Sequence, residues 1–550
     1  MNSILFPVPP EAVQTGGEIR HRMDLTAAKI LRHLDVENVF VRHFRHRRAI
    51  PDLPGGFAGY GMLLDAVVKA AVHNIGGDEM KQFKISRLKE LSTLQSIDGA
   101  ITIFSQEPGF WDNHDQAYMI QALVLDHQKF HNQDSLHTAL RLGEFLLNRR
   151  TGNTIGLETA FLMLWRETGD PRFLDFCRKA LQIESSIDCY DRTGAPCGTA
   201  HVYTWIARVL AQLQYCRMTG CGTAVAVGGA KELYHRIFSD YSSISGSCSG
   251  GFNWGEIWDS TQIGLGKWGE TCASAYLLRC SAKMLEFEAD SRYGDLYERV
   301  LYNAFFGAQS EDGLRQRYFI PFNEPGEWYE HETYCCPNNL RRMMFEIPDA
   351  IWFRTSDGIA VNLYTESRLA LPGLEIIQNT SYPESEEVKF SITADQSFQL
   401  TLRIPGWCTN ATVQGQTAVP GWYHLPLTVG KTTVQLELPM PVCQIRGTMA
   451  QTGRIALMRG PLVYGVELEP NGLNGHDIDL LEIDNARPFA PGAEGIAVSC
   501  RIPNQTHPEK RVLFTRFSRE KRNRTYFPAS TEKGWTDDPL YTKAGTRSSE

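Results

Sequence analysis

Two kinds of hydrophobic spacing divide the chain near residue 351. Between about Met23 and Ile351 apolar residues recur every three or four positions, the spacing of amphipathic helices. After Ile351 apolar and polar residues alternate, as they do in strands that bury one face. We therefore expect a multidomain α + β protein with a helical part followed by a β part.

The helical part is expected to contain about a dozen helices joined by short turns. The expected helices are Leu25 to His43, Gly61 to His73, Glu79 to Leu94, Asp115 to His131, Ser135 to Arg149, Leu157 to Thr168, Pro171 to Ile183, His201 to Thr219, Thr223 to Asp240, Cys272 to Glu288, Tyr293 to Ala308 and Cys336 to Ile351. Helix pairs repeated about six times predict an (α/α)6 barrel, whose pocket opens through the loops at one end.

The β part is predicted to be an antiparallel β-sandwich. Its expected strands are Ile359 to Tyr364, Val388 to Ile392, Phe398 to Ile404, Thr433 to Leu438 and a strand from Arg454 to Gly465 that breaks at Gly460-Pro461 and returns. We expect a catalytic barrel at 1–351, a sandwich at 352–470, and a reduced β segment with a polar tail at 471–550. The last twenty or so residues are expected to be frayed.

Composition excludes several classes of partner. The net charge of -8 and the pI near 6.0 provide no basic face for nucleic acid. No apolar run reaches about 20 residues, so no membrane span is expected. The N-terminus lacks the features of a secretory signal. The number of cysteines, thirteen, is odd, and in a protein without such a signal this indicates reduced thiols. We therefore expect a cytoplasmic location.

Four residues could hold a metal ion: Glu270, Cys272, Cys335 and Cys336. Adjacent cysteines have Cα atoms about 3.8 Å apart, whereas disulfides prefer roughly 5.5 Å, so a shared metal uses both thiols more easily than a bond between them. From spacing alone a purely structural alternative stays open, in which Cys272 is a small buried residue and Glu270 is a helix cap.

The spacing sets a condition on such a site. Glu270 and Cys272 share no helix face, so both can reach one metal only if Glu270 is still in the incoming loop, which Gly266 and Gly269 would allow. Four protein ligands normally form a closed structural site, and a catalytic role would require one thiolate to leave the metal or to react while bound.

Glu256 is a candidate general acid. It stands near Trp254, Trp258 and Trp268, whose rings could stack on sugars and raise its pKa. The alternative is a surface glutamate in a loop rich in glycine and tryptophan.

Several short motifs resemble those of glycoside hydrolase family 127, whose founding activity is β-L-arabinofuranosidase. The similarity runs from about Leu64 to Glu467. The motifs are Glu270-Thr271-Cys272-Ala273-Ser274, Tyr302-Asn303, Cys335-Cys336-Pro337, Leu402-Arg403-Ile404-Pro405-Gly406-Trp407, Leu438-Pro439-Met440-Pro441-Val442 and Arg459-Gly460-Pro461-Leu462-Val463-Tyr464.

The resemblance implies a barrel followed by β-sandwich material, and a zinc ion (Zn2+) held by one glutamate and three cysteines. It also implies a retaining mechanism in which Cys335 attacks the anomeric carbon and forms a thioglycosyl intermediate. Glu270, Cys272 and Cys336 would complete the metal shell. Glu256 matches the acid/base residue, which protonates the leaving oxygen and then deprotonates water.

Three further positions match active-site residues of the family: His114, His201 and Tyr318, which could hydrogen-bond sugar hydroxyls. A lone histidine is more often structural. Members usually carry a histidine where this chain has the turn 152–156. Its absence removes one sugar contact, so the pocket could accept a hydroxyl pattern that differs from that of β-L-arabinofuranose. The part after about Asp477 also departs from the family ending.

We therefore expect a zinc-dependent retaining exo-glycoside hydrolase that releases a terminal β-L-arabinofuranose-like sugar. Within the family, the alternative is release of carboxylated or deoxy sugars from pectic side chains. A rival is a non-catalytic carbohydrate-binding protein with a structural zinc, and lyases or epimerases share the predicted barrel. The expected partner is a glycoside or oligosaccharide, and a homodimer stays open.

Overall fold

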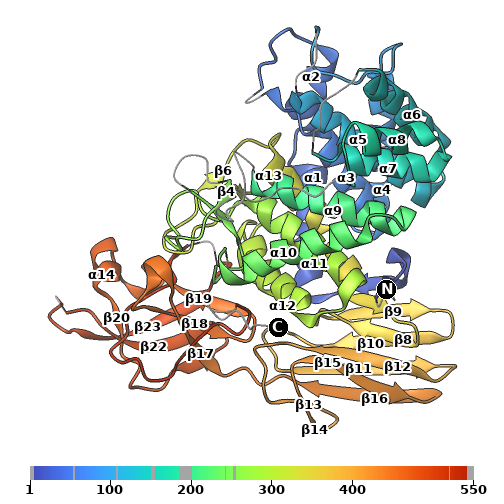
Figure 1. Cartoon of the computed structure of the whole chain (residues 1–550). Coiled ribbons are helices and arrows are strands. Elements are labelled where there is room, and N and C mark those ends of the chain that lie inside the picture. Colours follow the sequence, from blue (N-terminus) through green and yellow to red (C-terminus); the bar gives the residue numbers. More distant parts are fainter. Residues whose placement is uncertain are drawn as a thin grey trace.

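The computed structural model describes residues 5–53, 56–106, 110–149, 155–184, 201–241, 243–251, 256–503, 505–519 and 521–541. Helices occupy most of the chain up to Ile351 and strands dominate after it, which confirms the change in spacing. Figure 1 shows the helices above two groups of strands, yellow to orange on one side and red on the other.

The helical part resembles an (α/α) barrel. Its helices are α1 (Gly17–Arg32), α2 (Arg42–Arg45), α3 (Tyr60–Val72), α4 (Gly77–Thr93), α5 (Phe110–Phe130), α6 (Gln133–Asn148), α7 (Leu157–Thr168), α8 (Pro171–Lys179), α9 (Val202–Thr219), α10 (Thr223–Ser239), α11 (Thr271–Glu288), α12 (Ser291–Arg299) and α13 (Cys335–Met344). Contacts run from α3 through α5, α7, α9, α11 and α13 and back to α3, so these helices close an inner ring.

The expected helix from Leu25 to His43 is wrong in its bounds. α1 ends at Arg32, and a π turn (Glu37–Val41) precedes α2. The Asp35 carboxylate accepts from the Asn38 backbone N–H at 3.1 Å, so a side chain replaces a helical carbonyl as the acceptor at this point.

In the described part of the chain the strands form three large sheets and two short antiparallel pairs. They are β1 (Phe6–Pro7), β2 (Val13–Thr15), β3 (Ser249–Gly250), β4 (Ile257–Trp258), β5 (Gln316–Arg317), β6 (Trp328–Tyr329), β7 (Trp352–Arg354), β8 (Gly358–Val361), β9 (Ser367–Leu371), β10 (Leu374–Asn379), β11 (Glu387–Ala394), β12 (Phe398–Ile404), β13 (Ala411–Val413), β14 (Gln416–Ala418), β15 (Gly421–Leu427), β16 (Gly430–Glu437), β17 (Val442–Arg446), β18 (Ile455–Arg459), β19 (Leu462–Glu467), β20 (Glu482–Ile483), β21 (Ala490–Gly492), β22 (Gly495–Arg501), β23 (Glu509–Arg516), β24 (Arg522–Arg524) and β25 (Trp535–Thr536). A short helix, α14 (Gly475–Leu480), precedes β20.

The first two sheets are five- and seven-stranded, with the orders β1-β7-β8-β12-β15 and β14-β13-β16-β11-β10-β9-β2. The N-terminal strands β1 and β2 enter different sheets and so fasten the start of the chain to the β part. Most pairs are antiparallel, as expected, but β12 pairs β8 in parallel. The expected strand that breaks and returns near Gly460 is confirmed as the hairpin β18–β19.

The third sheet is nine-stranded and contains β17 to β25, so it includes strands on both sides of residue 470. The expectation of a frayed end is wrong for the described residues up to 541. β25 pairs β17 in parallel, and Leu540 is buried. The hydrophobic side chains Trp535 and Leu540 are too widely separated to produce a periodic pattern, yet each packs against residues far away in the sequence.

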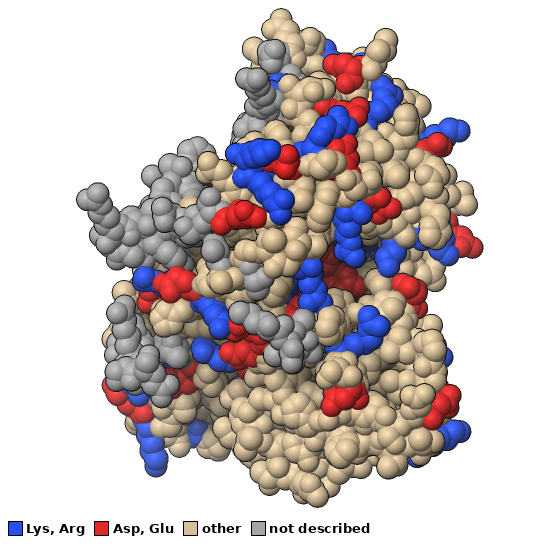
Figure 2. Space-filling model, turned by 45° about the vertical axis from the view of Figure 1, so that its right-hand side comes forward, with Lys and Arg blue, Asp and Glu red and all other residues tan. Residues whose placement is uncertain are grey.

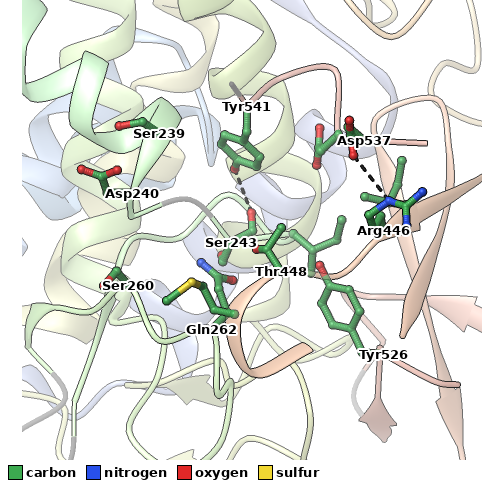
Figure 3. A pocket seen from close by; sticks show the side chains of 14 residues that line it. Ser239, Asp240, Ser243, Ser260, Gln262, Arg446, Thr448, Tyr526, Asp537 and Tyr541 are labelled. Atoms are coloured by element: carbon green, nitrogen blue, oxygen red, sulfur yellow. Dashed lines mark hydrogen bonds and ion pairs between the residues drawn. The ribbon is translucent and has the colours of Figure 1, made fainter. Parts of the chain in front are cut away.

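This end of the chain also closes the third sheet onto the helical part. The Tyr541 hydroxyl donates to the Ser243 carbonyl at 2.8 Å, and Arg299 donates to Asp538 at 2.7 Å. A cavity of about 460 Å³ lies at this junction (Figure 3), and its lining residues include Asp240, Tyr526 and Tyr541. None of the predicted site residues lines this cavity.

Basic and acidic side chains are interspersed on the face that Figure 2 shows, in keeping with the mixed composition. Within the described ranges, no helix combines the length and the apolar character that crossing a membrane would require.

Candidate active site

A cavity of about 820 Å³ opens beside the start of α13. Its wall is rich in aromatic rings, which can stack on the faces of sugars. The aromatic lining residues are Phe57, Trp111, Tyr318, Phe319, Trp328, Tyr329 and Tyr334. A volume of this size suits a small ligand.

The four predicted metal ligands meet beside this cavity. One ligand atom each from Glu270, Cys272, Cys335 and Cys336 lies within 4.8 Å of all the others, and the four residues are buried. The sulfurs of Cys272 and Cys336 are 3.2 Å apart. Cys335 differs from the other three because its side chain also lines the cavity.

The loop before α11 places Glu270 as the spacing required. Glu270 is the N-cap of α11, with φ -57° and ψ 132°, so it is not yet helical, whereas Cys272 lies in the first turn. Gly269 has φ +72°, and a Cβ there would lie 2.8 Å from the Ile320 carbonyl oxygen, so only glycine fits without strain. The backbone N–H of Glu270 donates to Ser249 Oγ at 2.8 Å.

Among the described helices, three begin next to the cluster of Glu270 and the three cysteines. α13 starts at Cys335, one residue earlier than expected, so both adjacent thiols lie in its first turn. His201 caps α9, and Glu270 caps α11. The positive end of each helix dipole therefore faces the cluster, which favours thiolates and carboxylates there.

Glu256 is held next to this cluster. Its carbonyl accepts from the Val202 N–H at 2.7 Å, which couples it to the start of α9. Its Oε1 accepts from the Tyr318 hydroxyl at 2.5 Å, and the same hydroxyl lies 3.7 Å from Cys335 Sγ. One tyrosine therefore bridges the predicted acid/base residue and the predicted nucleophile.

His201 joins the two carboxylates of the site. Its Nε2 lies 2.7 Å from Glu270 Oε1 and 3.5 Å from Glu256 Oε2. Burial alone would lower the pKa of His201, but the two carboxylates raise it to about 9. The imidazolium form at neutral pH can thus donate to Glu270.

The remaining pKa shifts suit a protonated acid beside a reactive thiolate. Burial raises the pKa of Glu256 and raises that of Glu270 to about 7. Hydrogen bonds from the thiols of Cys272 and Cys336 lower the pKa of Cys335 well below its usual range. The thiol best placed to face a ligand is therefore also the most easily ionised of the three.

His114 lies behind the cavity wall. It is completely buried, and its ring packs edge-on against Phe57 and Trp111, at centroid distances of 5.0 and 5.6 Å. It is not among the described residues that line the cavity, so direct contact of His114 with sugar stays a prediction. Trp254 and most of the turn 152–156 lie outside the described residues.

Two features of the site escaped the sequence analysis. Trp328, Tyr329 and Tyr334 line the cavity, but they lie in a segment without helical or strand periodicity that could have marked them. Asn339 donates to Cys272 Sγ at 3.2 Å. The available signal was its spacing, since residues three apart, such as Cys336 and Asn339, share a helix face.

Comparison with known families agrees with this site. The family described as β-L-arabinofuranosidase, GH127 catalytic domain, matches residues 57–349, and the GH127 middle domain matches residues 358–440. Together the two regions cover more than half of the chain and include every predicted site residue.

Individual relatives extend the similarity. The non-reducing end β-L-arabinofuranosidase of Bifidobacterium longum subsp. longum is 24% identical in an alignment of length 507 that covers 75% of this chain and 75% of that protein. A solved GH127 β-arabinofuranosidase superimposes with a TM-score of 0.80 at 18% identity, covering 98% of this chain and 99% of that one. The GH127 β-L-arabinofuranosidase of Geobacillus stearothermophilus T6 gives a TM-score of 0.74 at 20% identity, covering 94% and 100%. The chain thus belongs to the GH127 β-L-arabinofuranosidase family of glycoside hydrolases.

Proposed function

We propose that this chain is a zinc-dependent retaining exo-hydrolase that releases a terminal β-L-arabinofuranose-like sugar, with Cys335 as its nucleophile. One observation carries the proposal. Of the four clustered ligand candidates, Cys335 lines the cavity, and it shares the Tyr318 hydroxyl with Glu256.

The donor set of the cluster fits zinc. Three thiols and one carboxylate are typical of tetrahedral zinc sites, and soft sulfur donors disfavour magnesium and calcium. The second carboxylate oxygen of Glu270, Oε2, is buried and has no hydrogen-bond partner among the described residues. Buried polar atoms are normally satisfied, so this oxygen fits the role of a metal ligand. When bound, zinc supplies positive charge that keeps the thiols deprotonated.

The chain's own groups can carry out both steps of a retaining hydrolysis. In the first step Cys335 Sγ forms a bond to the anomeric carbon while the bond to the glycosidic oxygen breaks, and Glu256 gives its proton to that oxygen. In the second step the Glu256 carboxylate takes a proton from water, whose oxygen bonds to the anomeric carbon as the carbon–sulfur bond breaks. Tyr318 and His201 hold Glu256 between the steps.

The charge of the cavity favours a neutral sugar. Among its described lining residues, Lys267 is the one lysine or arginine, and it shares the wall with the carboxylates of Glu324 and Glu327 and the carboxyl group of Glu256. A carboxylated sugar would meet net negative charge there, because His201 is already paired with Glu270. This supports an arabinofuranose-like sugar over the acidic sugars of pectin.

A glycoside screen with a cysteine variant tests the proposal. Purified protein, with zinc and a reductant present, is expected to hydrolyse aryl β-L-arabinofuranoside faster than aryl uronides or deoxyglycosides. Cys335→Ser should lose this activity. Cys280→Ser, which changes another buried thiol in α11 away from the cluster, is the matched control and should keep it.

Other results would point elsewhere. Full turnover by Cys335→Ser would contradict the assignment of the nucleophile. A wild-type protein that binds zinc and sugar but hydrolyses none of these glycosides would favour the carbohydrate-binding rival with a structural zinc.

A further inference from the structure

Asn339 is a buried amide that touches the candidate metal cluster without belonging to it. It lies in α13, has no exposed surface, and its Nδ2 is 3.2 Å from Cys272 Sγ. An N–H group that points at a thiolate offers it a charge-assisted hydrogen bond.

Two arginines fix the direction of this amide. Arg279 Nη1 donates to Asn339 Oδ1 at 3.3 Å, and Arg342 Nη1 donates to the same oxygen at 3.1 Å. An amide nitrogen could not face two guanidinium donors, so Oδ1 must point to the arginines. With the oxygen fixed in this way, the amide nitrogen points to the Cys272 sulfur.

Ion pairs hold both arginines, one of them buried and the others partly buried. Arg279 Nε lies 2.6 Å from Glu346, which also pairs with Lys69 at 2.6 Å. Arg342 Nε lies 2.5 Å from Asp65. These residues come from α3, α11, α13 and the turn after α13, so three inner-ring helices fix the chain of contacts that ends at Cys272.

We propose that Asn339 is a positioning residue for the metal centre: its amide N–H orients the Cys272 thiolate and, with the two guanidinium groups behind it, offsets the negative charge of three thiolates and one carboxylate. This inference rests on the proposed zinc site. In this role Asn339 donates a hydrogen bond to a residue that ligates the metal. The loss of such hydrogen bonds typically weakens metal binding 10- to 100-fold.

Replacing Asn339 by Asp tests the direction of the hydrogen bond. The carboxylate keeps both arginine contacts but turns an oxygen towards the sulfur. We expect zinc affinity, measured by competition with a chromogenic chelator, to fall by about 10- to 100-fold. Asn339→Ala removes the donor without adding charge, so its zinc affinity should fall less than that of Asn339→Asp.

A matched control separates this effect from general damage. Asn303 is also fully buried, but it contacts Arg299 and Pro461 carbonyls and not the cluster. Asn303→Asp should lower the melting temperature and leave zinc affinity unchanged. In cobalt-loaded protein, the thiolate-to-cobalt charge-transfer band should shift in both Asn339 variants and stay in place in Asn303→Asp.

The outcomes are distinct. Folded Asn339 variants that bind zinc within twofold of wild type, with an unshifted cobalt band, would overturn the role of Asn339 while leaving the proposed function intact. If the Asp variant does not fold, Asn339→Ala decides by the same two measurements. Wild-type protein that binds no zinc would overturn the proposed metal site, and this inference with it.

Discussion

Replacing Glu256 by Gln should remove proton transfer and leave the site otherwise in place. The amide has the shape of the carboxyl group and can still accept from the Tyr318 hydroxyl, which lies 2.5 Å from Oε1. Burial holds Glu256 protonated to a higher pH than an exposed glutamate, and Gln has no proton to give. General acid–base catalysis contributes about 10²- to 10⁴-fold, or about 2.7–5.4 kcal/mol of barrier.

The leaving group determines how much of that loss appears in the first step. An alkoxide needs a proton to depart, so alkyl and oligosaccharide substrates should lose the full factor. Dinitrophenolate departs without help, so Glu256→Gln should show a near-normal burst of dinitrophenol followed by slow turnover. Stopped-flow absorbance of released dinitrophenolate measures both phases for the aryl substrate, and chromatography of quenched samples measures the rate for alkyl and oligosaccharide substrates.

Azide supplies the second half of the assay. It attacks the anomeric carbon without a general base, so it should restore steady-state turnover and yield a glycosyl azide of retained configuration. Glu327→Gln changes another glutamate of the same cavity and should show neither a burst nor rescue. Equal losses for all leaving groups, with no azide product, would refute the acid/base role of Glu256.

Three further changes test how the rest of the molecule supports this site. Burial raises the pKa of Glu256, and the first step needs its protonated form, so kcat/KM should fall as the pH rises through that raised pKa. If the same fall at high pH is seen unchanged in Glu256→Gln, this assignment is contradicted. Gln451→Ala removes a 2.7 Å hydrogen bond to the Gln262 carbonyl, in the segment that leads from Glu256 to the metal cluster, so kcat should fall about 10- to 100-fold with little change in KM. Arg403→Met leaves Asp295 buried without its partner at 2.5 Å and should cost about 3–5 kcal/mol of stability, visible by calorimetry as a lower Tm, whereas an unchanged Tm would rule this out.

Much of the fold could be predicted because its segments are locally regular. The bounds of α7 and β12 match the expected ranges, since each has an unbroken period and turn residues at its ends. What escaped is non-local pairing. β1, β2 and β25 are short strands without a period of their own, and they form only because a distant strand offers its edge.

The site divides in the same way. The adjacent pair Cys335-Cys336 has so few structural uses that sequence alone drew attention to it, and the family motifs gave Glu256 a role. Asn339 and Gln451 make hydrogen bonds to residues that lie far away in the sequence, and amide side chains occur in many roles. Spacing cannot separate such supports from ordinary buried polar groups.

Covalent attachment of the sugar to Cys335 can be detected directly. A slow fluorosugar substrate with a dinitrophenolate leaving group is mixed with zinc-loaded protein, quenched in acid, digested, and analysed by fragmentation mass spectrometry. One sugar residue on Cys335, absent from Cys335→Ser, is the predicted result. A burst of dinitrophenolate with the sugar on another residue, or with no adduct on the protein, would contradict it.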